Sequence, residues 1–210
     1  LMRAMTRLVL EMALDQAATW QAQGQQYLTI AVNLSASSLA DADLPEEILA
    51  MLAARGLPSN VLQLEITEES LTTDRDQARK ILTRLRDGGV QISVDDYGTG
   101  YNSLSYLRDL PIDELKLDRS FVFPMVDDAR AAALVASSIN LAHSLGLRMV
   151  AEGVETAAAY TELRRLGCDQ AQGYFMCRPV PAPELDYWLD TRRAADQPTD
   201  TLGPIPFAGL

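Results

Sequence analysis

Apolar residues recur three and four positions apart in several stretches of the chain, a spacing that predicts amphipathic helices. Glycine or proline follows most of these stretches and is expected to end each helix. The predicted helices cover residues 2–23, 45–55, 78–87, 103–110, 128–145, 156–166 and 182–189. The expected apolar stripe of the first is Met5, Leu8, Val9, Met12 and Ala13. That of the 128–145 helix is Ala131, Leu134, Val135, Ile139 and Ala142.

Shorter apolar runs separate these helices and predict six strands, over residues 27–34, 61–67, 91–96, 114–117, 148–151 and 169–174. Regular alternation of strand and helix predicts an α/β fold with a parallel sheet covered by helices. Such a sheet can be open and doubly wound or closed into a barrel. The open form lacks its nucleotide-binding fingerprint here, because no G-x-G-x-x-G sequence follows a strand. We therefore predict a TIM-type (β/α) barrel with six recognisable strand–helix units, its first two strands being absent and expected before Leu1. Residues 1–190 are predicted to form this domain and residues 191–210 a loosely held tail.

Polar side chains lie near the carboxyl end of each predicted strand. In chain order they are Asn33, Glu65, the pair Asp95 and Asp96, Lys116 with Asp118, Glu152, and Gln172. Because the carboxyl ends of barrel strands lie on one face, these side chains are expected to converge in one cavity. Carboxylate and amide oxygens are the ligands that hard cations take, so the set predicts a two-cation site with a lysine beside it.

The stretch from Gln91 to Gly100 combines a buried strand with this chemistry. Two adjacent carboxylates, Asp95 and Asp96, follow the apolar residues, and buried carboxylates need a positive partner. Gly98 and Gly100 allow the following loop to bend closely around a ligand. Taken alone, the stretch is equally compatible with a polar turn in which Asp95 caps a backbone amide.

The net charge of −11 argues against a nucleic-acid duplex as partner, because binding to phosphate backbones needs a basic surface. An anionic small molecule is compatible with this charge where a bound metal reverses the local field. No run of about 18 apolar residues occurs, so we expect no membrane contact by this segment. Cys168 and Cys177 form no C-x-x-C pair, which fits a reducing cytoplasm.

Six short motifs end the predicted strands in a fixed order. They are Asn33-Leu34-Ser35, Glu65-Ile66-Thr67-Glu68, Asp95-Asp96-Tyr97-Gly98-Thr99-Gly100, Lys116-Leu117-Asp118, Glu152-Gly153-Val154-Glu155 and Gln172-Gly173-Tyr174. This series resembles the motif series of the EAL family, bacterial phosphodiesterases that act on cyclic di-GMP. The resemblance covers about residues 1–189. It implies hydrolysis of one phosphodiester bond of cyclic di-GMP to linear 5′-pGpG, with two Mg²⁺ or Mn²⁺ ions.

The resemblance also implies roles for single residues. Asn33, Glu65 and Asp95 resemble ligands of the first metal, and Asp95, Asp96 and Glu152 ligands of the second. Lys116 resembles the residue that acts on the attacking water; as a cation among carboxylates it is expected to stay protonated and to position that water. Glu155 is expected to act near the metals beside Glu152. The loop after Asp96 is expected to be supported by Glu68, Gly98 and Gly100. Substrate or water is expected to be oriented by Gln172, Asp118 and Arg178.

The chain departs from the family at the motif that gives the family its name. No Glu-Ala-Leu sequence occurs in the 210 residues, and its glutamate, a further ligand of the first metal, is expected upstream of Leu1. We therefore expect the isolated chain to be weakly active or inactive. The alternative hypothesis is a cyclic di-GMP receptor or regulatory module without turnover; a third is a metal-dependent barrel in which Lys116 abstracts a proton.

The resemblance has implications for partners and location as well. It implies an upstream sensory or GGDEF-type domain in the full-length protein, and it is compatible with a homodimer. It also implies a cytoplasmic location, either as a free protein or as the cytoplasmic part of a larger, membrane-anchored one.

Overall fold

The computed structural model describes residues 2–25, 28–71, 74–99 and 104–195. Six strands form one sheet: β1 (Ile30–Leu34), β2 (Leu62–Thr67), β3 (Gln91–Tyr97), β4 (Glu114–Leu117), β5 (Arg148–Ala151) and β6 (Gln170–Ala171). The predicted strand over residues 169–174 is reduced to the two residues of β6, because the chain bends away after Gln172. All six strands predicted from the sequence are present.

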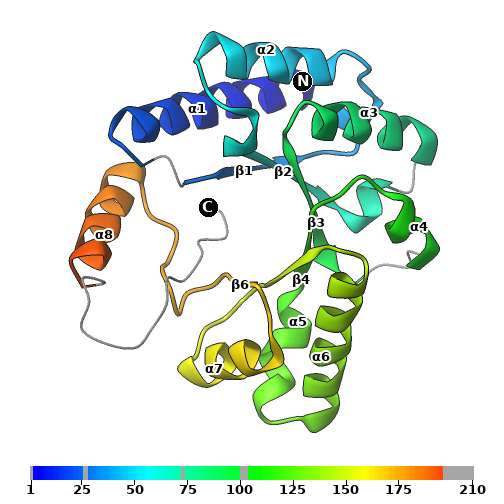
Figure 1. The fold of residues 1–210 in the computed structure, drawn as a ribbon, viewed down its shortest axis with the longest axis vertical. Helices are drawn as coiled ribbons and strands as arrows, with labels where there is room; N and C mark the ends of the chain where they lie inside the picture. The colour runs from blue at the N-terminus through cyan, green and yellow to red at the C-terminus, as the bar shows by residue number, and fades with distance from the viewer. Residues whose placement is uncertain (1, 26–27, 72–73, 100–103, 196–210) are drawn as a thin grey trace.

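In the described part of the chain, eight α-helices lie around the outside of the sheet (Figure 1). They are α1 (Met2–Ala22), α2 (Leu44–Ala54), α3 (Arg75–Asp87), α4 (Leu104–Asp109), α5 (Arg119–Val122), α6 (Ala129–Ser144), α7 (Ala157–Leu166) and α8 (Ala182–Ala195). Short 3-10 turns are η1 (Ser38–Ala40), η2 (Ser59–Val61), η3 (Glu68–Leu71) and η4 (Phe123–Val126). Sequence periodicity did not predict α5 and η4, which are each too short to show a helical repeat. No helix among the described residues combines the length and apolarity needed to cross a bilayer.

Capping residues explain where several helices begin and end. Thr156, the predicted N-cap, accepts a hydrogen bond from the Ala159 amide, and Asp74 does the same for Gln77 at the start of α3. Helix α7 ends at Gly167, whose left-handed φ of 81° suits glycine. The boundaries of α7 were predicted from Thr156 and Gly167, whereas α3 begins at Arg75, three residues before its predicted start.

The strands are all parallel and follow the chain in the order β1-β2-β3-β4-β5-β6. Such a sheet with its helices outside is the arrangement of a TIM-type barrel, and the predicted fold class is confirmed. Within the described residues, β1 and β6 each pair along one edge only, so the sheet is an open portion of the barrel wall.

The main core lies between the sheet and the inner faces of the helices. Strand residues such as Leu64, Ile92 and Leu115 are fully buried there, against Ile81 and Leu82 of α3. Strands β2 and β3 alternate in sequence: the apolar residues Leu62, Leu64, Ile66, Ile92 and Val94 are buried in this core, and the polar residues between them point to the other face of the sheet. This alternation explains why both strands could be found from the sequence.

The predicted buried face of α1 was wrong, and that of α6 was right in four of its five residues. On α1 the buried residues are Leu10, Leu14, Ala17 and Trp20, whereas four residues of the predicted stripe are exposed: Met5, Leu8, Val9 and Met12. On α6 four of the five predicted residues are buried, but Leu134 is 55% exposed. Both helices are apolar on more than one side, so periodicity alone cannot choose the side that meets the sheet.

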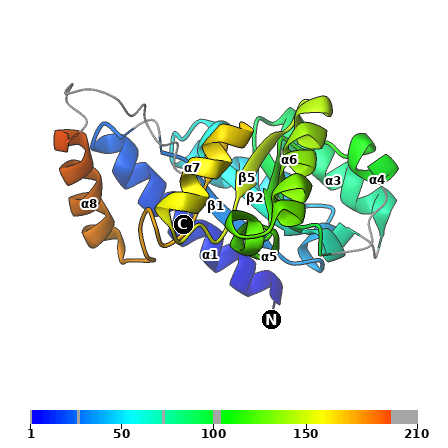
Figure 2. The same cartoon turned by 90° about the horizontal axis from the view of Figure 1, so that it is seen from below.

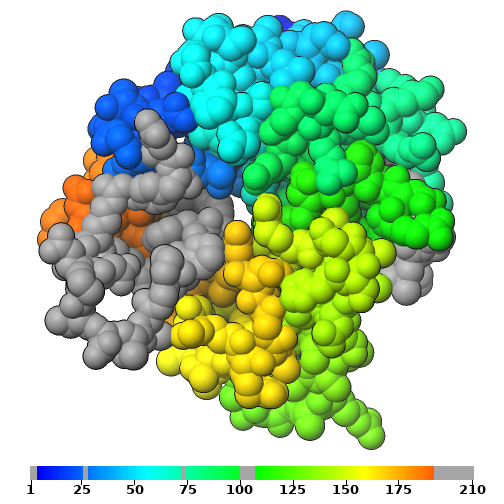
Figure 3. Space-filling model, in the orientation of Figure 1, coloured from blue at the N-terminus to red at the C-terminus, as the bar shows by residue number. Residues whose placement is uncertain are grey.

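Helix α8 lies beside α1 and brings the end of the described chain back to its beginning (Figures 1 and 2). The space-filling view shows these two helices adjoining on one side of the molecule (Figure 3). The indole of Trp20 donates a hydrogen bond to Asp186 Oδ1 at 2.7 Å, and Leu185 and Leu189 pack with Trp20 in a second, smaller core. The helix continues to Ala195, beyond its predicted end at Leu189 and into the predicted tail; residues 196–210 lie outside the described part.

Candidate functional site

Lys116 is the centre of a buried group of charges at the carboxyl ends of the strands. Its ammonium Nζ lies 2.7 Å from Glu152 Oε1, 2.9 Å from Glu65 Oε1 and 3.3 Å from Asp95 Oδ1. Lys116 is 3% exposed and Glu65 7%. Three carboxylates therefore surround one ammonium, and the group keeps an excess of negative charge.

The stagger of the sheet brings these four side chains together. Glu65 is the register partner of Ser93, and Asp95 lies two residues further along β3. In the same way Lys116 pairs with Val150, and Glu152 lies two residues further along the chain. Residues two apart in a strand point to the same face, so one layer inside the curved sheet holds all four.

Asp95 and Asp96 are adjacent in sequence and would point to opposite faces of a regular strand. A register shift between Val94 and Tyr97 interrupts the pairing of β3 with β4 at this point. Within it, Asp96 takes a positive φ of 55°, which is uncommon for any residue but glycine. This bulge allows both carboxylates to lie near Glu152, and one ligand oxygen from each of the three lies within 4.8 Å of the others.

Glu68 binds the loop after β3 through a hydrogen bond to its backbone. The amide of Gly98 donates a hydrogen bond to Glu68 Oε2 at 3.2 Å, which is the contact that a loop-supporting role requires. The amide and hydroxyl of Thr99 both donate to the carbonyl oxygen of Asp96 and tighten the same turn. Gly100, the other predicted loop residue, lies outside the described residues.

Burial and mutual repulsion set the protonation of the group. Burial raises the pKa of both Glu65 and Glu152 above the ordinary glutamate value, although Lys116 acts in the opposite direction. For Asp96 burial and the neighbouring Asp95 both raise the pKa. Burial opposes the charge on Lys116, but Glu65, Glu152 and Asp95 outweigh it and raise the lysine pKa. These carboxylates therefore favour the protonated form of Lys116, which suits a residue that positions water or stabilises negative charge.

The donor set fits divalent cations. Asp95, Asp96 and Glu152 offer converging oxygens, the preferred ligands of Mg²⁺ and Mn²⁺. Gln172 follows β6, the neighbour of β5, and its Oε1 is buried without a hydrogen-bond donor among the described residues. A buried amide oxygen of this kind can accept a hydrogen bond from a water or a ligand.

Among the described residues, four further predicted residues form no hydrogen bond or ion pair with this cluster, although the charge of Asp118 helps to raise the pKa of Asp96. Asn33 is the register partner of Glu65 on β1, but its side chain is exposed. Glu155 is exposed beyond β5, and the guanidinium of Arg178 lies 4.5 Å from the centre of the Tyr174 ring. Asp118 caps α5: it accepts hydrogen bonds from the amide and hydroxyl of Ser120. Burial works against ionisation of Asp118, but these bonds outweigh it and lower the pKa.

A second polar layer, which sequence reasoning missed, lies one level below Lys116. Glu114 is 1% exposed and accepts hydrogen bonds from Gln63 Nε2, from Ser93 Oγ at 3.0 Å and from Arg148 Nε at 3.3 Å. The available signal was its position two residues before Lys116, on the same face of β4. This layer supplies polar contacts where barrels commonly carry apolar residues.

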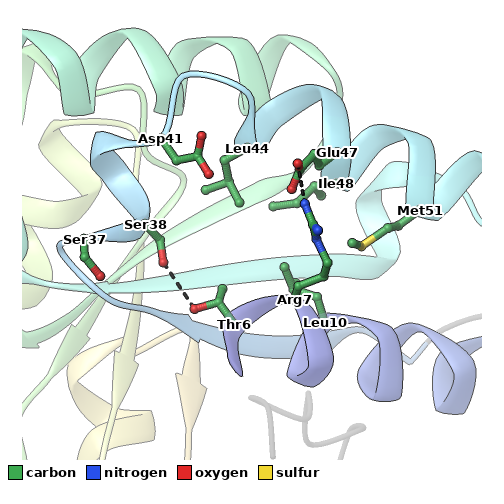
Figure 4. A pocket seen from close by; sticks show the side chains of 10 residues that line it. All are labelled: Thr6, Arg7, Leu10, Ser37, Ser38, Asp41, Leu44, Glu47, Ile48 and Met51. Carbon is green, nitrogen blue, oxygen red and sulfur yellow. Dashed lines mark hydrogen bonds and ion pairs between the residues drawn. The ribbon is translucent and has the colours of Figure 1, made fainter. Parts of the chain in front are cut away.

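A separate pocket of about 320 Å³ lies between α1, η1 and α2 (Figure 4). The hydroxyls of Thr6 and Ser38 face each other at 3.3 Å on one side, and Arg7 pairs with Glu47 on the other. None of its lining residues belongs to the carboxylate layer. The pocket is therefore distinct from the Lys116 site.

Comparison with known proteins identifies the family. Residues 1–179 match the profile described as the EAL domain. The chain belongs to the EAL domain family. It is 43% identical over 170 residues to the cyclic di-GMP phosphodiesterase NbdA of Pseudomonas aeruginosa, covering 81% of this chain and 22% of NbdA. It is 44% identical over 177 residues to the bifunctional diguanylate cyclase/cyclic di-GMP phosphodiesterase MucR of the same organism, covering 84% and 26%.

A solved structure described as the PaMucR phosphodiesterase in complex with c-di-GMP matches this EAL domain with a TM-score of 0.82. The identity is 42%, and the match covers 87% of this chain and 74% of that one. The present chain thus spans about a quarter of the length of the two curated relatives, and most of one solved domain.

Proposed function

We propose that this EAL domain hydrolyses one phosphodiester bond of cyclic di-GMP, with Mg²⁺ or Mn²⁺, to give linear 5′-pGpG. The observation that carries the proposal is the convergence of Asp95, Asp96 and Glu152 beside the Lys116–Glu65 pair. NbdA and MucR carry the name of this activity, and the solved PaMucR structure contains the dinucleotide.

In the proposed site, Asn33, Glu65 and Asp95 would hold the first cation, and Asp95, Asp96 and Glu152 the second. Such cations would acidify a water molecule and neutralise charge on the phosphate oxygens. In the hydrolysis, the water oxygen forms a bond to phosphorus as the bond from phosphorus to the ribose O3′ breaks; the water gives up one proton, and the O3′ leaving group takes up one.

The protein's own part is to position the reactants and to stabilise charge. Lys116, kept protonated by its three carboxylate neighbours, donates hydrogen bonds towards the attacking water or the phosphate and stabilises developing negative charge. Gln172 offers its unpaired amide oxygen to a water or to the substrate. Glu155 is proposed to act near the metals, and Asp118 and Arg178 are proposed to orient substrate or water.

The test is nucleotide chromatography of cyclic di-GMP incubated with the 210-residue chain and with a form extended at its N-terminus by a family segment containing Glu-Ala-Leu. We expect the extended form to release 5′-pGpG only with Mg²⁺ or Mn²⁺, and the 210-residue chain to be much slower, because geometry at the scale of about 1 Å decides catalytic rates. Comparable rates for both forms would show that the first metal site was assigned wrongly.

A receptor without turnover is the second candidate. Binding draws on contacts over the whole ligand and tolerates the loss of one metal ligand better than catalysis does. An extended form that binds cyclic di-GMP tightly but leaves it intact would establish the receptor. The name of MucR supports the further proposal that a GGDEF-type domain accompanies the EAL domain in the full-length protein.

A further inference from the structure

The short helix α5 touches both loops that carry the converging carboxylates. One loop follows Asp95 and Asp96 and contains Gly98; the other follows Glu152 and contains Gly153. A Cβ atom added to Gly98 would lie 2.8 Å from Cε2 and Cζ of Phe121. One added to Gly153 would lie 2.4 Å from Cβ of Arg119. Each loop backbone is therefore in direct contact with a side chain of the same four-residue helix.

The two contacting residues lie on opposite sides of α5. Successive residues of a helix are about 100° apart around its axis, so Arg119 and Phe121 are separated by about 200°. Helix α5 consequently lies between the two loops and keeps them apart. Both glycines also have positive φ values, 99° and 66°, so the loops take conformations that bring their backbones close to the helix.

The position of α5 is itself well fixed. Asp118 caps its first turn, Val122 is 1% exposed, and Met125 in the following turn is 2% exposed. One residue separates β4 from the helix, which begins three residues beyond Lys116. One element thus connects the strand that carries Lys116 with the loops that carry Asp95, Asp96 and Glu152.

We propose that Phe121 and Arg119 are positioning residues that set the distance between the Asp95–Asp96 pair and Glu152. Mg²⁺ demands nearly ideal octahedral geometry at about 2.0–2.1 Å, so a cation held by both loops depends on their separation. The inference rests on the proposed metal site but assigns its geometry to residues that contact neither metal nor substrate.

The test is Mn²⁺ binding by the full chain, measured by calorimetric titration and by the upward shift of the melting temperature on adding Mn²⁺ after EDTA treatment. Phe121→Ala is expected to weaken Mn²⁺ binding by about tenfold or more, within the range known for residues that support metal ligands. Phe123→Ala is the matched control, because Phe123 is two residues away and 77% exposed; it should bind Mn²⁺ as the wild type does.

The melting temperature in EDTA shows whether a variant is destabilised without metal, so it distinguishes a loss of stability from a loss of Mn²⁺ binding. If Phe121→Ala fails to fold, Phe121→Leu keeps much of the buried volume but loses the flat ring against Gly98, and a smaller Mn²⁺-induced shift than in the wild type supports the proposal. Wild-type Mn²⁺ affinity in a folded Phe121 variant, or an equal loss in Phe123→Ala, overturns it. A wild-type chain that binds no Mn²⁺ contradicts the proposed metal site, and with it this inference.

Discussion

Lys116 Nζ lies closer to Glu152 Oε1, at 2.7 Å, than to the oxygens of Glu65 or Asp95. The two residues come from neighbouring parallel strands, and the bond joins the one buried cation of this layer to an expected ligand of the second metal. Lys116 and a metal ion therefore draw on the same carboxylates, which gives the first prediction.

Lys116→Met should weaken the fold and strengthen metal binding. Removing one partner of a buried ion pair typically destabilises a protein by about 3–5 kcal/mol, because the remaining carboxylates lose their counter-charge. Divalent cations can then supply that charge, so Mn²⁺ affinity should rise while hydrolysis is lost. Urea unfolding in EDTA and Mn²⁺ titration measure the two effects. The only other lysine, Lys80, is exposed on α3, and Lys80→Met should change neither stability nor Mn²⁺ affinity. Unchanged Mn²⁺ affinity in Lys116→Met would contradict the idea that Lys116 and the metal compete for the same carboxylates.

Asp95→Asn should abolish metal-dependent hydrolysis by the extended form. Asp95 is the residue expected to bridge both cations, and an amide supplies a neutral oxygen in place of a charged one. Chromatography of the nucleotide product at matched Mn²⁺ measures the loss. Asp127→Asn, at an exposed position after η4, is the control that should retain full activity. Activity near the wild-type level in Asp95→Asn would rule out the bridging role.

Mn²⁺ affinity should fall with decreasing pH, and the fall should begin above the pH at which an ordinary glutamate titrates. Burial raises the pKa of Glu65 and Glu152, so these carboxylates take up protons at a pH above about 4.3. Protons and metal compete for the same oxygens, so each proton taken up weakens binding. Titrations between pH 4 and pH 8 test this, and a fall in affinity confined to the pH range of an ordinary glutamate would contradict it.

Glu114→Gln should destabilise the fold without a comparable effect on metal binding. The amide keeps part of the hydrogen bonding to Gln63 and Ser93 but leaves Arg148 without its carboxylate partner. Losing hydrogen bonds to buried or charged groups costs about 1–3 kcal/mol. Urea unfolding should show this loss, with Mn²⁺ affinity within a few-fold of the wild type. A larger effect on Mn²⁺ than on stability would place Glu114 in the metal site instead.

The sequence was sufficient for the strands, most helices and the order of the sheet. Glu65, Asp95, Lys116 and Glu152 could be selected because each is a charged residue at the end of an apolar strand, and parallel strands bring such ends together. The predicted role of each residue stays a prediction, but the four do form one cluster.

The missed features depend on tertiary structure. Burial of Glu114 follows from the stagger of four strands, and the contacts of Phe121 and Arg119 follow from two loops distant in sequence. The bulge that turns Asp96 towards Asp95 leaves no local sequence signal beyond the following Gly98. The exposed face of α1 could not be told from the buried one, because both are apolar.

The joint between α1 and α8 has a consequence for spectroscopy. Both tryptophans of the chain are there: Trp20 is buried and bonded to Asp186, and Trp188 packs against the same small cluster. Neither indole lies in the layer around Lys116. The tryptophan fluorescence of this protein therefore reports whether α8 is packed against α1. Detachment of α8 would expose Trp20 to water and shift its emission to longer wavelength while the carboxylate site is still folded.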